Sequence, residues 1–126
     1  MAEKIKLVQG DTKPIIIVSL TDETTGAPLG LTGSTVQMFF RAVGSTTILA
    51  TVAGVLLTGR VLDDGSIDTT SPYNGVGAGG RVQFLWGTTD LVQPAGDYEG
   101  EIQITYADSS IQTVYDLLKF KLREDF

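Results

Sequence analysis

The sequence contains no cysteine and no histidine. Without cysteine there is neither a disulfide framework nor a thiolate metal ligand, and the chain suits synthesis in a reducing cytoplasm. Without histidine the most common general base is missing. The two absences exclude catalytic triads and zinc sites of the usual kinds. We therefore expect a protein that is not an enzyme and that uses no cofactor and no metal.

Long apolar runs and an excess of positive charge are also missing. The longest largely apolar stretch, residues 48–57, is interrupted by Thr51 and Gly54 and falls well short of the roughly 20 residues of a membrane helix. Nine basic residues against fifteen acidic ones give a net charge of -6, which repels phosphate backbones and anionic lipids. We expect neither nucleic acid nor a membrane as a partner.

Short runs of alternating apolar and polar residues dominate the sequence, and Gly, Pro, Asp and Asn interrupt them. No helical period is evident. The 126 residues fit a single domain, residues 1–126. Seven or eight short strands in a chain of this size predict an all-β fold, a two-sheet antiparallel immunoglobulin-like β-sandwich.

Three strands have a clear inward face. The expected inward residues are Val36, Met38 and Phe40, then Val82, Phe84 and Trp86, then Tyr98, Gly100, Ile102, Ile104 and Tyr106. Residues 13–20 are apolar at nearly every position, which predicts a central strand buried on both faces. The alternative for this segment is an interface on its outer face.

Two segments near the ends of these strands are less regular. Residues 66–80 are poor in large apolar side chains and rich in glycine, which predicts a surface loop. From Ile111 to Leu117 the odd-numbered residues form the expected inward face. Leu118, Phe120 and Leu122, which continue the apolar pattern, are even-numbered. A strand cannot switch faces without an extra residue, so the sequence predicts a β-bulge near Leu117 and Leu118.

Three residues are expected to have structural roles. Residues 91–98 resemble a tyrosine corner, in which Tyr98 would bond back to the turn that includes Gly96. Trp86 shares its parity with Val82 and Phe84, which favours a core position; the alternative is a platform for stacking a sugar.

Two motifs look like ligand sites. Residues 75–80 match the dinucleotide pattern G-x-G-x-x-G, but an alternating strand follows where the mechanism needs a helix, so we expect a loop. Asp63, Asp64 and Asp68 could surround a calcium ion. Because Asp64-Gly65 is a common turn signal, we interpret this segment as a polar turn.

Two stretches have the order and spacing of pieces found together in a known domain. The first runs from Val8-Gln9-Gly10-Asp11-Thr12-Lys13-Pro14 through residues 15–20 and 26–33 to residues 35–41. The second joins residues 95–102 to Tyr106-Ala107-Asp108, residues 111–113 and Phe120. Together they resemble the immunoglobulin-like N-terminal domain of phage baseplate upper proteins over residues 5–122, with a poor match in residues 44–80. At Ser109 the family pattern favours glycine.

This resemblance implies a virion structural protein, an adaptor in a bacteriophage tail or baseplate, or at a tail-fibre attachment. Its partners would be other phage tail or baseplate proteins, and it would be a homo-oligomer in the assembled particle. It would lie in the virion tail after synthesis in the host cytoplasm. The alternative is a surface-exposed immunoglobulin-like module that binds a host glycan or protein. The candidate partner-binding residues are Tyr73, Asn74, Val43 and Ile48, and strand addition at a sheet edge is the expected mechanism.

Overall fold

A computed structural model describes residues 4–22, 24–114 and 117–126. All the secondary-structure elements in these residues are strands, which confirms the expected all-β class. The strands are β1 (Ile5–Val8), β2 (Ile16–Ser19), β3 (Thr35–Ala42), β4 (Ala50–Leu56), β5 (Arg60–Val61), β6 (Ile67–Asp68), β7 (Arg81–Phe84), β8 (Gly96–Thr105), β9 (Ile111–Thr113) and β10 (Leu118–Arg123).

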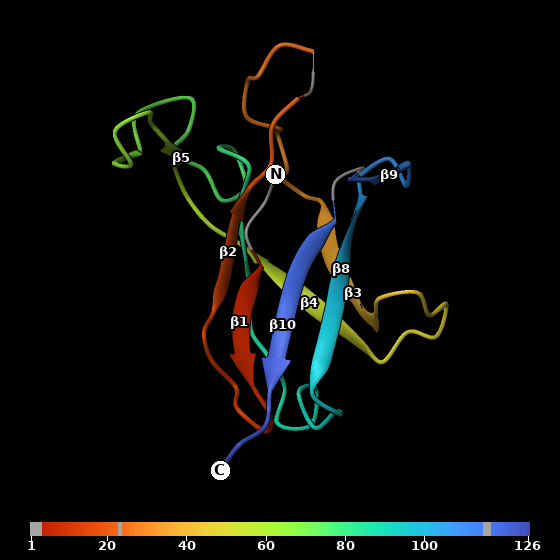
Figure 1. Ribbon diagram of the computed structural model, residues 1–126. Coiled ribbons are helices and arrows are strands. Elements are labelled where there is room, and N and C mark those ends of the chain that lie inside the picture. The colour runs from red at the N-terminus through yellow and green to blue at the C-terminus, as the bar shows by residue number, and fades with distance from the viewer. Residues whose placement is uncertain (1–3, 23, 115–116) are drawn as a thin grey trace.

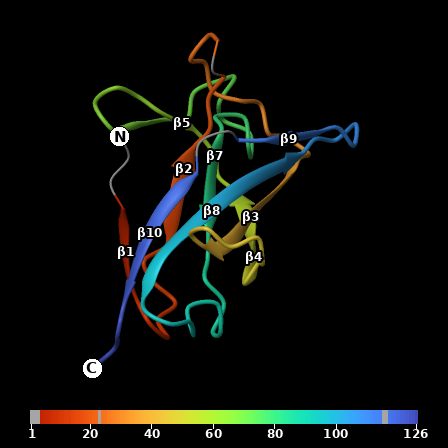
Figure 2. The same ribbon diagram turned by 45° about the vertical axis from the view of Figure 1, so that its right-hand side comes forward.

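The strands form one continuous hydrogen-bonded path and a separate hairpin. The path runs β1-β10-β8-β3-β4-β7-β2, with β9 also paired to β8, and β5 pairs with β6. Only β1 and β10 are parallel. The path curls, so that β4 crosses behind β10 and β8 (Figure 1), and β2 and β7 lie behind β10 and β8 in the turned view (Figure 2). Two separately bonded sheets were expected; β4 instead pairs with both β3 and β7.

The core lies inside this curl and is formed by the residues that the alternation predicts. The expected inward residues are buried except Tyr106, which is half-buried and packs against the core. Apolar residues of β1, β2 and β10 are buried with them. They form one hydrophobic cluster that includes Val36, Met38, Phe40, Val82, Phe84, Trp86, Tyr98, Ile102, Ile104, Phe120 and Leu122. The inward faces of β3, β7 and β8 are therefore confirmed.

Residues 13–20 do not form a central strand. Strand β2 ends the path and pairs only with β7, so its second edge has no neighbour in the sheet. Ile16 is buried, whereas Ile15 and Ile17 are 40% and 53% exposed. The prediction of burial on both faces is wrong, because nothing in the described chain covers the outer face of this strand.

Of the last two strands, β10 has an inward face, whereas all three residues of β9 are exposed. Thr113 lies opposite Gln103 and Leu118 lies opposite Gly100, so five steps along the last strands match three steps along β8. Two extra residues therefore lie between β9 and β10 relative to β8. The even-numbered residues Val114, Leu118, Phe120 and Leu122 pack in or against the core, whereas the expected apolar face of Ile111 and Thr113 is exposed. The predicted bulge adjoins residues 115 and 116, which lie outside the described residues.

The glycine-rich end of residues 66–80 is not a surface loop. Gly77, Gly79 and Gly80 are buried. A methyl group on Gly79 would lie 1.8 Å from the carbonyl oxygen of Gly59, and one on Gly80 would lie 2.4 Å from the carbonyl oxygen of Leu20. These glycines let backbone segments approach each other closely, which also explains the pattern that imitates a nucleotide-binding motif.

We predict that Gly79→Ala lowers the free energy of unfolding by at least about 3 kcal/mol, because the new methyl group overlaps backbone that cannot move aside as a side chain could. Urea unfolding followed by tryptophan fluorescence measures the change. Gly75→Ala is the matched control, since its nearest contact would be 3.9 Å away. Equal unfolding midpoints for the two variants would contradict the assigned packing.

Candidate functional site

The predicted partner-binding residues lie in two separate segments. Val43 and Ile48 belong to the loop that joins β3 to β4, and both are exposed. This loop projects to the right in Figure 1, away from the green segment that contains Tyr73 and Asn74. The loop is anchored at both ends by backbone hydrogen bonds. The Val43 N–H donates to the Asp97 carbonyl (3.1 Å), and the Leu49 N–H donates to the Phe40 carbonyl (2.8 Å). The structure therefore does not bring the four residues together.

Tyr73 is half-buried, although it lies in the segment that was expected to be a surface loop. The guanidinium carbon of Arg60 lies 4.3 Å from the centre of the Tyr73 ring. The carbonyl of Tyr73 accepts a hydrogen bond of 2.9 Å from the Gly59 N–H. One ring face is thus covered by a cation, and the residue supports the β5–β6 hairpin. Asn74 is exposed, and its contact with a partner stays a prediction.

Of the three residues with expected structural roles, Tyr98 and Trp86 are buried in the core and Gly96 is exposed at the start of β8. The Tyr98 hydroxyl donates to the Pro94 carbonyl, which is the tyrosine corner that the sequence predicts, and burial raises the pKa of Tyr98. Trp86 is 5% exposed and its Nε1–H donates to the Pro14 carbonyl at 3.1 Å, so it is not a platform for sugars. Gly96 begins β8 with a φ of 155°, an angle that favours glycine.

Exposed apolar side chains lie around Gln83 on the outside of β2, β7 and β4. Ile17 and Val55 lie on the two sides of Gln83, each directly opposite it in the ladder. Ile15 and Leu85 each lie one residue beyond the paired Ile16 and Phe84. All four apolar side chains are at least 40% exposed. We call Ile15, Ile17, Val55 and Leu85 the β2 face. Residues 14–20 contain no charged side chain that would protect the free edge beside it.

A second surface is basic, although the protein is acidic. Five of the nine basic residues lie on the outside of β1 and β10 or directly before β1: Lys4, Lys6, Lys119, Lys121 and Arg123. Lys4 pairs with Asp97 (3.0 Å), and Lys119 pairs with the buried Glu99 (3.4 Å). We call the cleft lined by Lys6, Leu7, Val8, Lys121 and Arg123 the basic cleft.

The β5–β6 hairpin carries acidic residues at its tip. Asp64 accepts hydrogen bonds from the hydroxyl (2.6 Å) and N–H (2.9 Å) of Ser66, which lower its pKa. Hydrogen bonds from Thr70, with a further one from Arg60, lower the pKa of Asp68 to about 2. These carboxylates complete turns, and the described residues contain no group of acidic side chains placed to hold a metal ion.

Comparison of the sequence with known protein families finds no family model that matches, and comparison with curated proteins finds no relative. No helix in residues 4–22, 24–114 and 117–126 is long and apolar enough to span a membrane.

We predict that Tyr98→Phe lowers the free energy of unfolding by about 1 kcal/mol, because the Pro94 carbonyl loses its hydrogen-bond donor while the ring keeps its packing. Tyr106→Phe is the control, since that hydroxyl bonds to the exposed Gln112 and its loss should cost less than about 0.5 kcal/mol. Thermal unfolding of both variants makes the comparison. A larger loss in Tyr106→Phe would argue against the corner as the stabilising contact.

Proposed function

We propose that the chain is a structural protein of a bacteriophage virion, an adaptor in the tail or baseplate that binds neighbouring tail proteins through an immunoglobulin-like domain. The neighbouring order β10-β8-β3, the β2–β7 pair and the tyrosine corner at the start of β8 support the immunoglobulin-like assignment. The resemblance of residues 5–122 to baseplate upper proteins supports the phage assignment.

The β2 face is the observation that carries the adaptor role. Ile17 of β2 and Val55 of β4 lie on either side of Gln83 of β7, and Ile15 and Leu85 adjoin the ends of β2 and β7. All four apolar side chains are exposed on one face, and a group of exposed apolar side chains of this kind marks an interaction site in a folded protein. The patch is continuous with the free edge of β2, whose outward backbone groups have no strand partner in the described chain. A partner strand can satisfy these groups, while the partner's apolar side chains cover the patch.

The absence of charge along this edge fits docking better than simple exposure. Proteins commonly protect free edges with lysine or proline in the strand. Strand β1, at the other end of the path, contains Lys6 and follows Lys4. Lys13 and Pro14 precede β2, but the strand itself is Ile-Ile-Val-Ser and contains neither lysine nor proline. An edge without these residues in the strand, beside an apolar face, would favour aggregation unless a partner covers it in the assembled particle.

The alternative, a module that binds a host glycan, has less support. A sugar would stack on an exposed aromatic ring. Tyr73 was the candidate ring, and Arg60 covers one of its faces. Trp86 is buried.

We predict that Ile17→Lys reduces incorporation of the protein into phage particles at least about tenfold, because docking would bury an unpaired charge. Mass spectrometry of purified virions measures the amount incorporated. Ile17 is more than half exposed, so the variant should fold with nearly unchanged stability.

Val92→Lys is the matched control, since Val92 is also exposed but lies in the turn before β8, outside the β2 face. It should enter particles at the wild-type level. Absence of the wild-type protein from virions would defeat the proposed function, and normal incorporation of Ile17→Lys would remove the β2 face from it.

A further inference from the structure

We propose that copies of this chain bind one another head to tail, with the acidic tip of the β5–β6 hairpin of one copy seated in the basic cleft of the next. The inference rests on the proposed assembly role and names a second copy as the occupant of the cleft. Two surfaces of the same chain, complementary in charge and each partly apolar, carry the argument.

The basic cleft concentrates positive charge that the described chain neutralises only in part. Asp97 lies opposite Lys121, and the Lys121 charge contributes, after the contact with Lys4, to the lowered pKa of Asp97. Lys6 and Lys121 lie directly opposite each other on neighbouring strands, and Arg123 lies next to them, opposite Val8. Like charges in such positions repel and lower stability. Among the described residues, neither Lys6 nor Lys121 has an acidic group within ion-pairing distance. The Arg123 guanidinium donates to the Glu124 carbonyl and lies 4.9 Å from the centre of the Phe126 ring, but it has no acidic partner either. An anionic group in the cleft would relieve this repulsion.

The floor of the cleft adds an apolar component. Val8 is half-buried between the basic side chains, and Leu7 is buried beneath them. A fitting occupant therefore carries acidic groups together with apolar side chains. A free inorganic anion would satisfy only the first requirement.

The β5–β6 hairpin has this combination. Asp63 and Asp64 form its exposed tip, and Val61, Leu62 and Ile67 beside them are also exposed. The hairpin is held in shape before any contact is made, because Arg60 pairs with Asp68 (3.0 Å) and the Leu62 N–H donates to the Ser66 carbonyl (2.9 Å). A preordered element loses less conformational entropy on binding than a flexible loop does.

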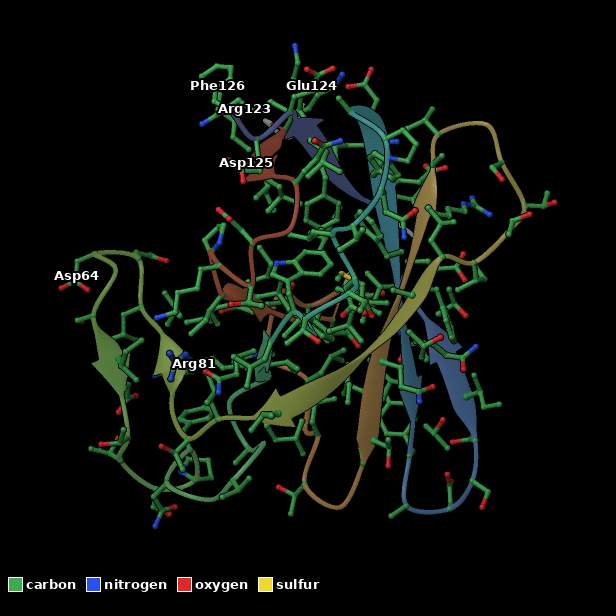
Figure 3. The ribbon with its side chains drawn as sticks, turned by 90° about the horizontal axis from the view of Figure 1, so that it is seen from below. Asp64, Arg81, Arg123, Glu124, Asp125 and Phe126 are labelled. Carbon is green, nitrogen blue, oxygen red and sulfur yellow. The ribbon has the colours of Figure 1, made fainter. Side chains whose placement is uncertain are left out.

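The hairpin and the cleft cannot meet within one molecule. Seen from below, Asp64 lies at the left edge of the molecule and Arg123 lies at its top, on separate segments (Figure 3). The hairpin projects from the upper end of the molecule in Figure 1, whereas β10 ends at the lower end. Each copy would therefore use its hairpin on one neighbour and its cleft on the other. Such a contact generates a ring if the rotation closes and an open filament if it does not.

Sedimentation velocity of the purified full chain over a concentration series tests the proposal. The wild type should associate, and raising the salt concentration should weaken the association because the contact is largely electrostatic. Two double variants each remove one surface: Lys6→Glu with Lys121→Glu in the cleft, and Asp63→Lys with Asp64→Asn in the hairpin. Asparagine at position 64 keeps the acceptor for the Ser66 N–H. Each variant should raise the dissociation constant at least about tenfold.

A mixture of the cleft double variant with the hairpin double variant is the decisive experiment. The cleft variant keeps its acidic hairpin and the hairpin variant keeps its basic cleft, so the mixture should associate although neither component does alone. Lys13→Glu and Asp11→Lys are control charge reversals outside both surfaces, and they should associate like the wild type. Circular dichroism confirms that each variant is folded.

Three results would overturn the proposal: a wild type that stays monomeric at every concentration and salt level, association that neither double variant weakens, or a mixture that stays dissociated. The first would assign Lys6 to protection of an edge strand. The second would assign self-association to another surface. Because the experiment uses purified protein, its failure leaves the virion test of the proposed function intact, and the reverse also holds.

Discussion

A cluster of four aromatic rings packs the two sides of the curled sheet against each other. Phe40 stacks on Tyr98 with ring centres 5.0 Å apart, and it contacts Trp86 edge-on at 5.1 Å and Phe120 at 5.6 Å. The rings come from β3, β8, β10 and the segment after β7, so each side of the curl contributes. Such pairs add about 0.5–1.5 kcal/mol each beyond their buried area. The Trp86 hydrogen bond to Pro14 extends this attachment to the chain that leads into β2.

Alternation along a strand is local information, and it predicts the features that depend on it. Val36 to Phe40 and Tyr98 to Ile104 face the core because every second residue of a strand does. Whether both faces of residues 13–20 are buried depends instead on which other segments pack around the strand, and the strand's own sequence does not contain this information. Glycine is equally typical of flexible loops and of close backbone approach, so the burial of Gly79 against Gly59 could not be predicted from composition.

Among the candidate surfaces, too, some features follow from local sequence and others depend on contacts between distant segments. Exposure of Val43 and Ile48 follows from their place in a turn between strands. Tyr73 sits in an equally polar segment, yet Arg60 covers it, and nothing in the sequence links the two residues. The basic cleft joins residues more than 100 positions apart through the parallel pairing of β1 with β10. Its only signal in the sequence is lysine at alternate positions near both ends of the chain.

The two free edges of the sheet path are chemically different, and this difference bears on assembly. Strand β1 presents lysines, which disfavour pairing with another β1, whereas β2 presents isoleucine and no charge. A protein with two apolar edges would pair indiscriminately, and one with two basic edges would pair with few strands. One apolar edge for strand addition and a separate basic cleft for an acidic hairpin allow one chain to bind two kinds of neighbour through surfaces that do not compete.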